Sequence, residues 1–287
     1  MIWKFRGREF DLSARGVIVG IVNVTPDSFS DGGMFPDADS AARHGLQLIR
    51  EGADILDVGG ESTRPGAVAV TEREELARVI PVIEALRRAT SVPISIDTSK
   101  AVVAEAAIAA GADIINDVTS LGGDLQMGQV AASSDAGLIL MHMQGTPETM
   151  QQSPEYEGND VAGEVAKYLS ERREAALGFG VNQAAIILDP GLGFGKTMAH
   201  NLALIRSLPC LCKLGSPVLI GHSRKSFLAA FAGVEEKASP GDRLPAGIAV
   251  TALARELGAR LFRVHDPAPH CAALRVTEAV FNQGASI

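Results

Sequence analysis

Three residues have side chains suited to holding a polar heterocycle. Asp97, Asn116 and Asp189 each follow a short apolar run of the chain. A carboxylate accepts two parallel hydrogen bonds, and an asparagine amide both donates and accepts. This set matches the edge of a 2-amino-4-oxo pyrimidine ring, and Lys225 can donate to the carbonyl and nitrogen on the opposite edge. Each of the three residues alone is equally compatible with a helix N-cap, so the hypothesis rests on the set.

A second group of residues is suited to an anion. Arginine binds phosphate in a bidentate manner, and histidine adds a further donor. Arg263 and His265 occupy alternate positions of one short segment, so we expect them to face the same side and to share an anion with Arg64. The side-chain oxygen of Asn23 is a candidate ligand for a Mg²⁺ ion that substrate phosphates largely hold. Taken singly, Arg263 would more often form a surface ion pair.

The segment from Ser223 to Ser226, SRKS, directly follows another apolar run and is predicted to open a helix. Hydroxyl groups, free backbone N–H groups and the helix dipole together favour a carboxylate or a phosphate there, although a plain serine N-cap has the same pattern. Phe29 and Phe194 lie in loops and can wall an aromatic ring. The sequence has no Gly-x-Ser-x-Gly elbow, Walker A loop or metal-ligand spacing, which leaves binding and electrostatics as its chemistry.

The elements that position these residues are eight short apolar runs separated by helical stretches. The runs cover residues 17–22, 55–58, 93–96, 114–115, 138–141, 186–188, 218–220 and 261–262. Strands that alternate with helices pair in parallel, and parallel strands present polar residues at one common end. The pattern predicts an α/β fold, a (β/α)8 TIM barrel with its active site at the C-terminal face of the strands. An open doubly wound sheet would gather polar residues at one switch point, whereas here they follow all eight runs.

Helical stretches fill the intervals between these runs. Their predicted ranges are 38–50, 72–88, 102–110, 126–135, 161–177, 201–208, 225–231, 244–257 and 267–281. The glycines expected to end helices in the left-handed conformation are Gly111, Gly137, Gly180 and Gly258. The connections 23–36 and 59–70 are too long for simple strand–helix turns and are candidate lids over the active face.

Length, charge and cysteine content narrow the class of protein. The chain has 287 residues, which suits one barrel domain over 1–287, and a formal net charge of −8. A negative field opposes nucleic acid and anionic membranes, so we expect neither as a partner. The three cysteines fit neither a zinc nor a redox spacing and are expected to be reduced thiols. A cytoplasmic location is expected, because no signal-peptide pattern or long apolar stretch occurs.

Nine motifs resemble those of the dihydropteroate synthase family, in the order in which that family carries them. The two long motifs are VNVTPDSFSDGG at 22–33 and DVGGESTRPG at 57–66. The shorter ones are SIDT at 95–98, IND at 115–117, MHMQG at 141–145, LDPG at 188–191, GFGK at 193–196, SRKS at 223–226 and RVHD at 263–266. The resemblance spans almost the entire chain, and the first two motifs are highly specific.

The resemblance implies that the protein condenses 6-hydroxymethyl-7,8-dihydropterin diphosphate with p-aminobenzoate. The products are 7,8-dihydropteroate and pyrophosphate, in folate biosynthesis. The residues that match the pterin site are Asp97, Asn116, Met143, Asp189, Gly221, Lys225 and Arg263. Those that match the diphosphate site are Asn23 (with Mg²⁺), Arg64, Arg263 and His265. Those that border the p-aminobenzoate pocket are Phe29, Thr63, Pro65, Phe194, Ser223 and Ser226.

The same resemblance implies a mechanism without a protein nucleophile. Diphosphate leaves in an SN1-like step and the arylamine then attacks, with catalysis assigned to Asn23, Arg64, Asp97, Asp189, Lys225, Arg263 and His265. The resemblance further implies a homodimer and competition between sulfonamides and p-aminobenzoate.

Two alternatives and one atypical residue accompany this interpretation. A methyltetrahydrofolate-dependent corrinoid methyltransferase would not need the cluster of Arg263 and His265, and a catalytically silent pterin-binding barrel would have no reason to keep it. His222 stands where the family usually has a smaller side chain. We expect it to point into the barrel wall rather than to line the pterin pocket, because side chains alternate along a strand.

Overall fold

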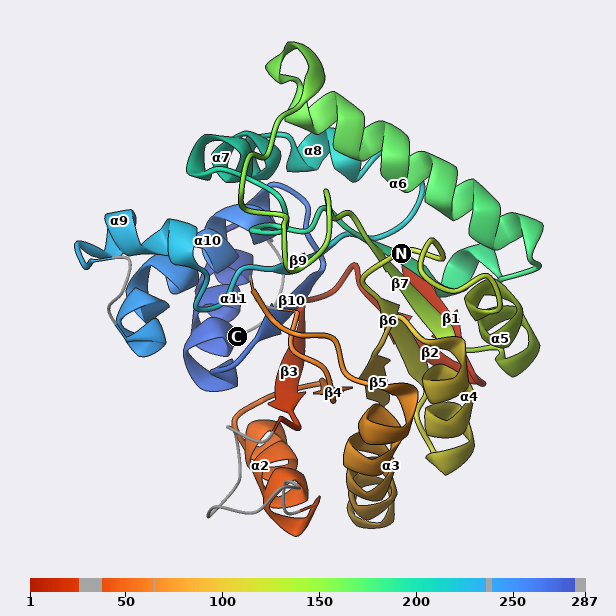
Figure 1. Cartoon of the computed structure of the whole chain (residues 1–287). Helices are drawn as coiled ribbons and strands as arrows, with labels where there is room; N and C mark the ends of the chain where they lie inside the picture. The colour runs from red at the N-terminus through yellow and green to blue at the C-terminus, as the bar shows by residue number, and fades with distance from the viewer. Residues whose placement is uncertain (26–37, 64–65, 236–238, 282–287) are drawn as a thin grey trace.

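The computed structural model describes residues 1–25, 38–63, 66–235 and 239–281. Eight parallel strands form a ring that helices surround (Figure 1). The strands are β3 (Val17–Asn23), β4 (Ile55–Gly59), β5 (Ile94–Asp97), β6 (Ile114–Asp117), β7 (Gly137–Met141), β8 (Ile186–Asp189), β9 (Leu219–Gly221) and β10 (Leu261–Val264). They pair in the order β8-β7-β6-β5-β4-β3-β10-β9, and a bridge between Leu188 and Val218 joins the two ends. The predicted (β/α)8 barrel is confirmed.

Successive side chains of each strand alternate between the inside of the barrel and the surrounding helices. At the level of the strand starts, one apolar cluster fills the interior, and its strand members are Val17, Val19, Ile55, Ile114, Ile139, Ile187, Leu219 and Leu261. A larger cluster packs the outward-facing strand residues against the helices. The lower half of the barrel is therefore a packed core rather than a pore.

An N-terminal hairpin, which the sequence patterns did not predict, closes this lower end. Strands β1 (Ile2–Phe5) and β2 (Arg8–Asp11) pair antiparallel. Trp3 and Phe5 are fully buried in the interior cluster with their ring centroids 4.4 Å apart. Trp3 Nε1 also donates a hydrogen bond to Ala185 O at 2.8 Å. Because the hairpin fills this end, a ligand has to approach from the carboxyl ends of the strands.

Helices connect the strands on the outside of the barrel. They are α2 (Ala38–Arg50), α3 (Glu72–Ala89), α4 (Ala101–Ala110), α5 (Met127–Ser134), α6 (Val161–Gly178), α7 (Met198–Arg206), α8 (Leu208–Leu211), α9 (Ala229–Ala232), α10 (Leu244–Glu256) and α11 (Pro267–Phe281). Short 3₁₀ turns cover Glu157–Asn159, Gln183–Ala185, Ser226–Leu228 and Pro240–Arg243. None of the helices in the described ranges combines the length and the apolar character that a membrane crossing requires.

The expectation that Gly137 ends a helix is wrong. Asp135, with φ of 52°, ends α5 in the left-handed conformation, and Gly137 is the first residue of β7. A Cβ at Gly137 would lie 3.0 Å from Trp3 Cζ2. The glycine is therefore explained by the close approach of the N-terminal hairpin and not by a helix end.

Candidate active site

The alternation along the strands places a polar layer directly above the apolar interior cluster. Ile55, Ile114, Ile187, Leu219 and Leu261 face inward. The residues two positions further along each strand face the same way, and they are Asp57, Asn116, Asp189, Gly221 and Arg263. Asp97 joins them from β5, where it is in register with Asn116. The structure thus brings the predicted carboxylates and amide together inside the barrel.

Arg263 lies in this layer between two carboxylates. Its Nε donates to Asp57 Oδ2 at 2.6 Å and its Nη2 to Asp97 Oδ2 at 2.6 Å, while Asn116 Nδ2 donates to Asp57 Oδ2 at 3.2 Å. Burial raises the pKa of Asp97 to about 7, although the Arg263 guanidinium opposes the shift. Burial alone would lower the pKa of Arg263, but the two carboxylates raise it above its ordinary value. The guanidinium therefore stays charged.

Asp189 and Lys225 form the other side of the layer. Burial raises the pKa of Asp189 and lowers the pKa of Lys225 to about 7, and the attraction between the two groups opposes both shifts. Lys225 Nζ donates to Leu192 O and lies 4.0 Å from the centroid of the Phe194 ring. A Cβ at Gly193 would lie 2.9 Å from Lys225 Cδ, so the lysine occupies space that the glycine leaves open. The loop after β8 therefore positions this lysine.

His265 and Ser223 pair at the ends of β10 and β9. His265 N donates to Ser223 Oγ at 3.2 Å, and His265 Nδ1 lies 3.1 Å from the same oxygen. Strand β10 ends at Val264, so the alternation that predicted a common face for Arg263 and His265 stops before the histidine. Their shared anion site stays a prediction.

The helix predicted over 225–231 is wrong in extent. The chain forms a 3₁₀ turn at Ser226–Leu228, followed by the four-residue helix α9. Arg224, with φ of 61°, is left-handed and pairs with Asp266 through hydrogen bonds of 3.0 and 2.7 Å. A helix dipole at Ser223–Ser226 therefore gives no support for an anion, and hydrogen bonds from the serine hydroxyls to a ligand stay a prediction.

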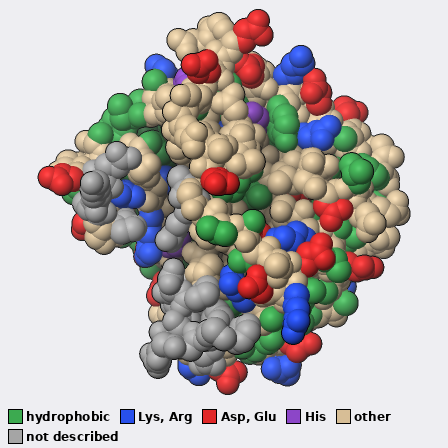
Figure 2. Space-filling view, in the orientation of Figure 1, with side chains coloured by type: hydrophobic (Ala, Val, Ile, Leu, Met, Phe, Trp, Pro, Cys, Tyr) green, Lys and Arg blue, Asp and Glu red, His purple; other side chains and the backbone are tan. Residues whose placement is uncertain are grey.

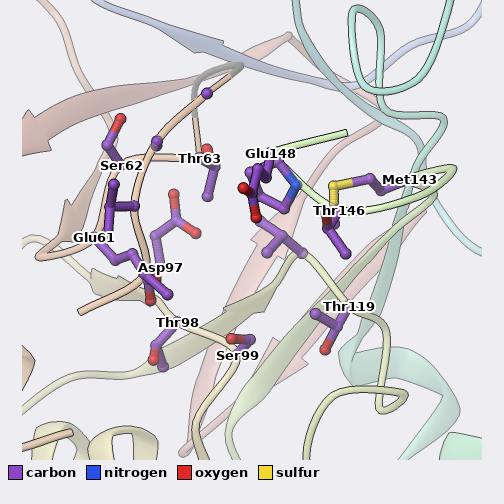
Figure 3. A pocket seen from close by; sticks show the side chains of 16 residues that line it. Glu61, Ser62, Thr63, Asp97, Thr98, Ser99, Thr119, Met143, Thr146 and Glu148 are labelled. Atoms are coloured by element: carbon purple, nitrogen blue, oxygen red, sulfur yellow. The ribbon is translucent and has the colours of Figure 1, made fainter. Parts of the chain in front are cut away.

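A cavity of about 540 Å³ opens beside the polar layer. Figure 3 shows Glu61, Ser62, Thr63 and Asp97 along one side of it, and Met143 and Thr146 along the other. Asp97 belongs both to the cavity wall and to the polar layer, so the two are continuous. Of the predicted site residues, Thr63, Asp97 and Met143 therefore line one common space.

Four predicted site residues remain to be placed. Phe29, Arg64 and Pro65 lie outside the described residues. Asn23 pairs with Gly59, which in turn pairs with Asp97, so the register places Asn23 at the level of the polar layer.

Asp57 is a site residue that the sequence reasoning missed. Its side chain is fully buried, and its Oδ1 has no hydrogen-bond partner among the described residues. A signal was present, since Asp57 interrupts the apolar run at 55–58 and a carboxylate at such a position requires a buried partner.

Lys196 and His142 were also missed. Lys196 Nζ lies 2.9 Å from His142 Nδ1 and donates to Phe194 O at 2.9 Å. Burial lowers the pKa of Lys196 well below its ordinary value. This contact ties the loop after β8 to the end of β7 and so supports the position of Phe194.

His222 points into the barrel wall, as expected. Its Nε2 lies 3.0 Å from Gly247 O and 2.9 Å from Thr251 Oγ1, both in α10. Thr251 Oγ1 also lies 2.7 Å from His270 Nδ1 in α11. His222 therefore belongs to the packing between β9 and two outer helices.

Fold and site together define the class of this protein. A closed (β/α)8 barrel gathers three carboxylates, an amide, a lysine and an arginine at the carboxyl ends of its strands, where barrel enzymes carry their active sites.

Comparisons with known proteins narrow this class. The profile of the pterin binding enzyme family matches residues 19–265. A dihydropteroate synthase of Neisseria meningitidis serogroup B is 47% identical over 284 residues, which cover 97% of each chain. The structure of Xanthomonas albilineans dihydropteroate synthase with 4-aminobenzoic acid has a TM-score of 0.89 and 46% identity, covering 99% of each chain. A Yersinia pestis dihydropteroate synthase with a sulfonamide drug has a TM-score of 0.90 and 40% identity, covering 98% of this chain and 100% of that one.

The chain belongs to the pterin binding enzyme family, and within it to the dihydropteroate synthases. The family resemblance that the motifs carry is confirmed. The relatives favour the synthase over the methyltransferase alternative.

Proposed function

We propose that this chain condenses 6-hydroxymethyl-7,8-dihydropterin diphosphate with p-aminobenzoate in the polar layer and the adjoining cavity. The observation that carries the proposal is the buried layer itself, where Arg263 holds Asp97 next to Asn116 at the mouth of the barrel. In the reaction, the bond between the pterin methylene carbon and the diphosphate oxygen breaks. The arylamine nitrogen bonds to that carbon and loses a proton, and pyrophosphate leaves.

The polar layer is assigned to the pterin. Asp97 and Asp189 accept hydrogen bonds from the amine and ring N–H groups, Asn116 adds a donor and an acceptor, and Lys225 donates to the opposite edge. Loss of diphosphate leaves positive charge on the pterin and its methylene carbon. Carboxylates that are already fixed inside a dry barrel stabilise that charge without reorganisation. The 2.6 Å bond from Arg263 fixes Asp97 before the substrate arrives.

The diphosphate is assigned to Asn23, Arg64, Arg263 and His265. Asn23 would hold Mg²⁺ together with the substrate phosphates, and the ion would offset the charge of the leaving pyrophosphate. The donor set fits this arrangement, because the described residues offer no cluster of three or more His, Cys, Asp or Glu that can hold a metal ion alone. On the face shown in Figure 2, acidic and basic side chains are interspersed.

The p-aminobenzoate is assigned to the mouth of the barrel, next to Thr63, Phe194 and Ser223. Phe194 is held in place through its carbonyl by Lys196. Phe29, Pro65 and Ser226 complete the proposed pocket. The positioned arylamine needs only to be close and aligned to attack, because proximity supplies much of the rate.

The test is a pyrophosphate-release assay with both substrates and Mg²⁺, in which each component is omitted in turn. We expect release only in the complete mixture. Pterin binding without pyrophosphate release would favour the silent barrel, and methyl transfer to cobalamin would favour the methyltransferase.

We also propose that two copies of the chain form a homodimer. Leu253 of α10 and Val276, Val280 and Phe281 of α11 are large apolar side chains that are exposed, and the two helices pack against each other. Val276 and Val280 are four residues apart and so lie on one face of α11. Light scattering at micromolar concentration measures the mass in solution. We expect twice the mass of one chain, and the mass of a single chain would contradict the proposal. The cytoplasmic location likewise stays a proposal.

A further inference from the structure

The loop between β4 and α3 is tied at both ends by one carboxylate outside the polar layer. Glu61, at the start of the loop, accepts a hydrogen bond from Val70 N, at its end, at 3.2 Å. The other Glu61 carboxylate oxygen accepts from Lys100 Nζ. A single side chain thus holds the two ends of the loop together and fixes both to the start of α4.

Lys100 is shared with a second carboxylate. Its Nζ donates to Glu75 Oε2 at 2.5 Å, and the Glu75 side chain is fully buried in α3. The other Glu75 oxygen, Oε1, has no hydrogen-bond partner among the described residues. A buried carboxylate requires a charged partner, so Glu75 fixes the position of the ammonium group. Burial alone would lower the pKa of Lys100, but hydrogen bonds to Glu61 and Glu75 raise it.

Further contacts fix the backbone of the same loop. Arg78 Nη1 donates to Gly60 O at 2.7 Å, and a Cβ at Gly60 would lie 2.7 Å from Val79 Cγ1. Gly66 N donates to Pro147 O at 3.0 Å. The loop start is therefore held against α3, and its middle is held against the loop after β7.

We propose that Glu61, Lys100 and Glu75 are positioning residues that hold this loop, and with it Thr63, in the geometry that binds p-aminobenzoate. Thr63 follows Glu61 by two residues, and both side chains line the cavity (Figure 3). The inference rests on the proposed function, which assigns Thr63 to the p-aminobenzoate pocket.

The expected consequence is a selective change in KM. When a loop is competent for only part of the time, the apparent affinity of its ligand falls by that fraction, whereas saturating ligand restores the competent state. None of the residues assigned to the pterin lies on this loop, and Asp97, Asn116, Asp189 and Arg263 lie on strands inside the barrel. Loss of the tie should therefore raise the KM for p-aminobenzoate and leave kcat and the KM for the pterin substrate nearly unchanged.

The decisive variant is Glu61→Gln, which keeps the shape of the side chain but can accept from only one of Lys100 and Val70. Loss of one hydrogen bond to a charged group corresponds to roughly a tenfold rise in the KM for p-aminobenzoate. Glu9→Gln is the matched control, because it removes the same charge from the exposed Lys4 pair at the opposite end of the barrel. Lys100→Ala should raise the same KM, and Lys100→Arg should restore it.

The outcomes separate this inference from the proposed function. Wild-type enzyme that releases no pyrophosphate contradicts the proposed function. With active wild-type enzyme, a Glu61→Gln variant whose KM for p-aminobenzoate matches that of Glu9→Gln overturns the inference alone. A fall in kcat at unchanged KM also overturns it, because that result indicates a general loss of structure. If Lys100→Ala does not fold, the KM of Glu61→Gln alone tests the inference. We expect this variant to fold, because the Glu61 side chain is part-exposed.

Discussion

Replacement of Arg263 by alanine tests the electrostatic core of the site. The guanidinium donates to Asp57 and Asp97 at 2.6 Å each, and its side chain is only 20% exposed. Removal of one partner from a buried ion pair costs about 3–5 kcal/mol. We expect about 3 kcal/mol of transition-state stabilisation to be lost, because Asp97 is no longer held in place. This loss corresponds to a roughly 150-fold fall in kcat/KM for the pterin substrate.

The same variant should change the pH dependence in a defined direction. Burial raises the pKa of Asp97 to about 7 and Arg263 lowers it, so removal of the guanidinium moves this pKa above 7. Asp97 then ionises only at higher pH, and the acidic limb of kcat/KM shifts upward. Steady-state pyrophosphate release from pH 5.5 to 9 measures both effects.

Arg263→Lys is the control, because it keeps the charge but can reach only one of the two carboxylates. We expect it to lie between wild type and alanine in both measurements. An alanine variant with kcat/KM within threefold of wild type, or with an acidic limb that stays in place, would refute this reasoning.

Three further predictions concern other parts of the structure. Lys225→Ala removes the cation that faces Asp189, and we expect the KM for the pterin diphosphate to rise about 10- to 100-fold in the same assay; an unchanged KM contradicts the assignment. Sulfonamides should raise the KM for p-aminobenzoate without lowering kcat, and a lower kcat at saturating p-aminobenzoate would argue against a common pocket. Burial lowers the pKa of His222 to about 3 and of His270 to about 4, so both are neutral when folded, whereas the unfolded chain takes up protons below pH 6.5. The free energy of unfolding should therefore decrease as the pH is lowered from 6.5 to about 4, by up to about 1.4 kcal/mol per pH unit for each histidine. Urea unfolding of His270→Asn should show a smaller change of this free energy with pH. A change equal to that of the wild type would contradict a buried, neutral His270.

Local patterns account for the parts of the molecule that could be predicted. Short apolar runs at a regular spacing define the strands, and residues that follow a run fall on the inner face by simple alternation. This reasoning brought Asp97, Asn116 and Asp189 together correctly inside the barrel. It also set the strands too short, because it ended them at the last apolar residue, whereas β5 and β8 continue to Asp97 and Asp189.

The features that were missed depend on partners far away in the sequence. Arg263 contacts Asp57 across 206 residues, and Trp3 contacts Ala185 across 182. No local pattern encodes such a pair. A buried aspartate in an apolar run, as at Asp57, indicates that a partner exists but does not identify it.

The position of the N-terminal hairpin explains why the polar layer lies where it does. Trp3 and Phe5 complete the lower apolar core, and the interior carboxylates Asp57, Asp97 and Asp189 lie above it in the upper half of the barrel. There Asp57 and Asp97 share the single positive charge of Arg263, and Asp189 is attracted by Lys225, so three carboxylates meet two cations. A site whose charges are paired before substrate binds can stay dry and fixed in geometry without collapsing or admitting water. Arg263 and Lys225 therefore offset part of the cost of burying these carboxylates, and the pterin has only to match a pattern that is already in place.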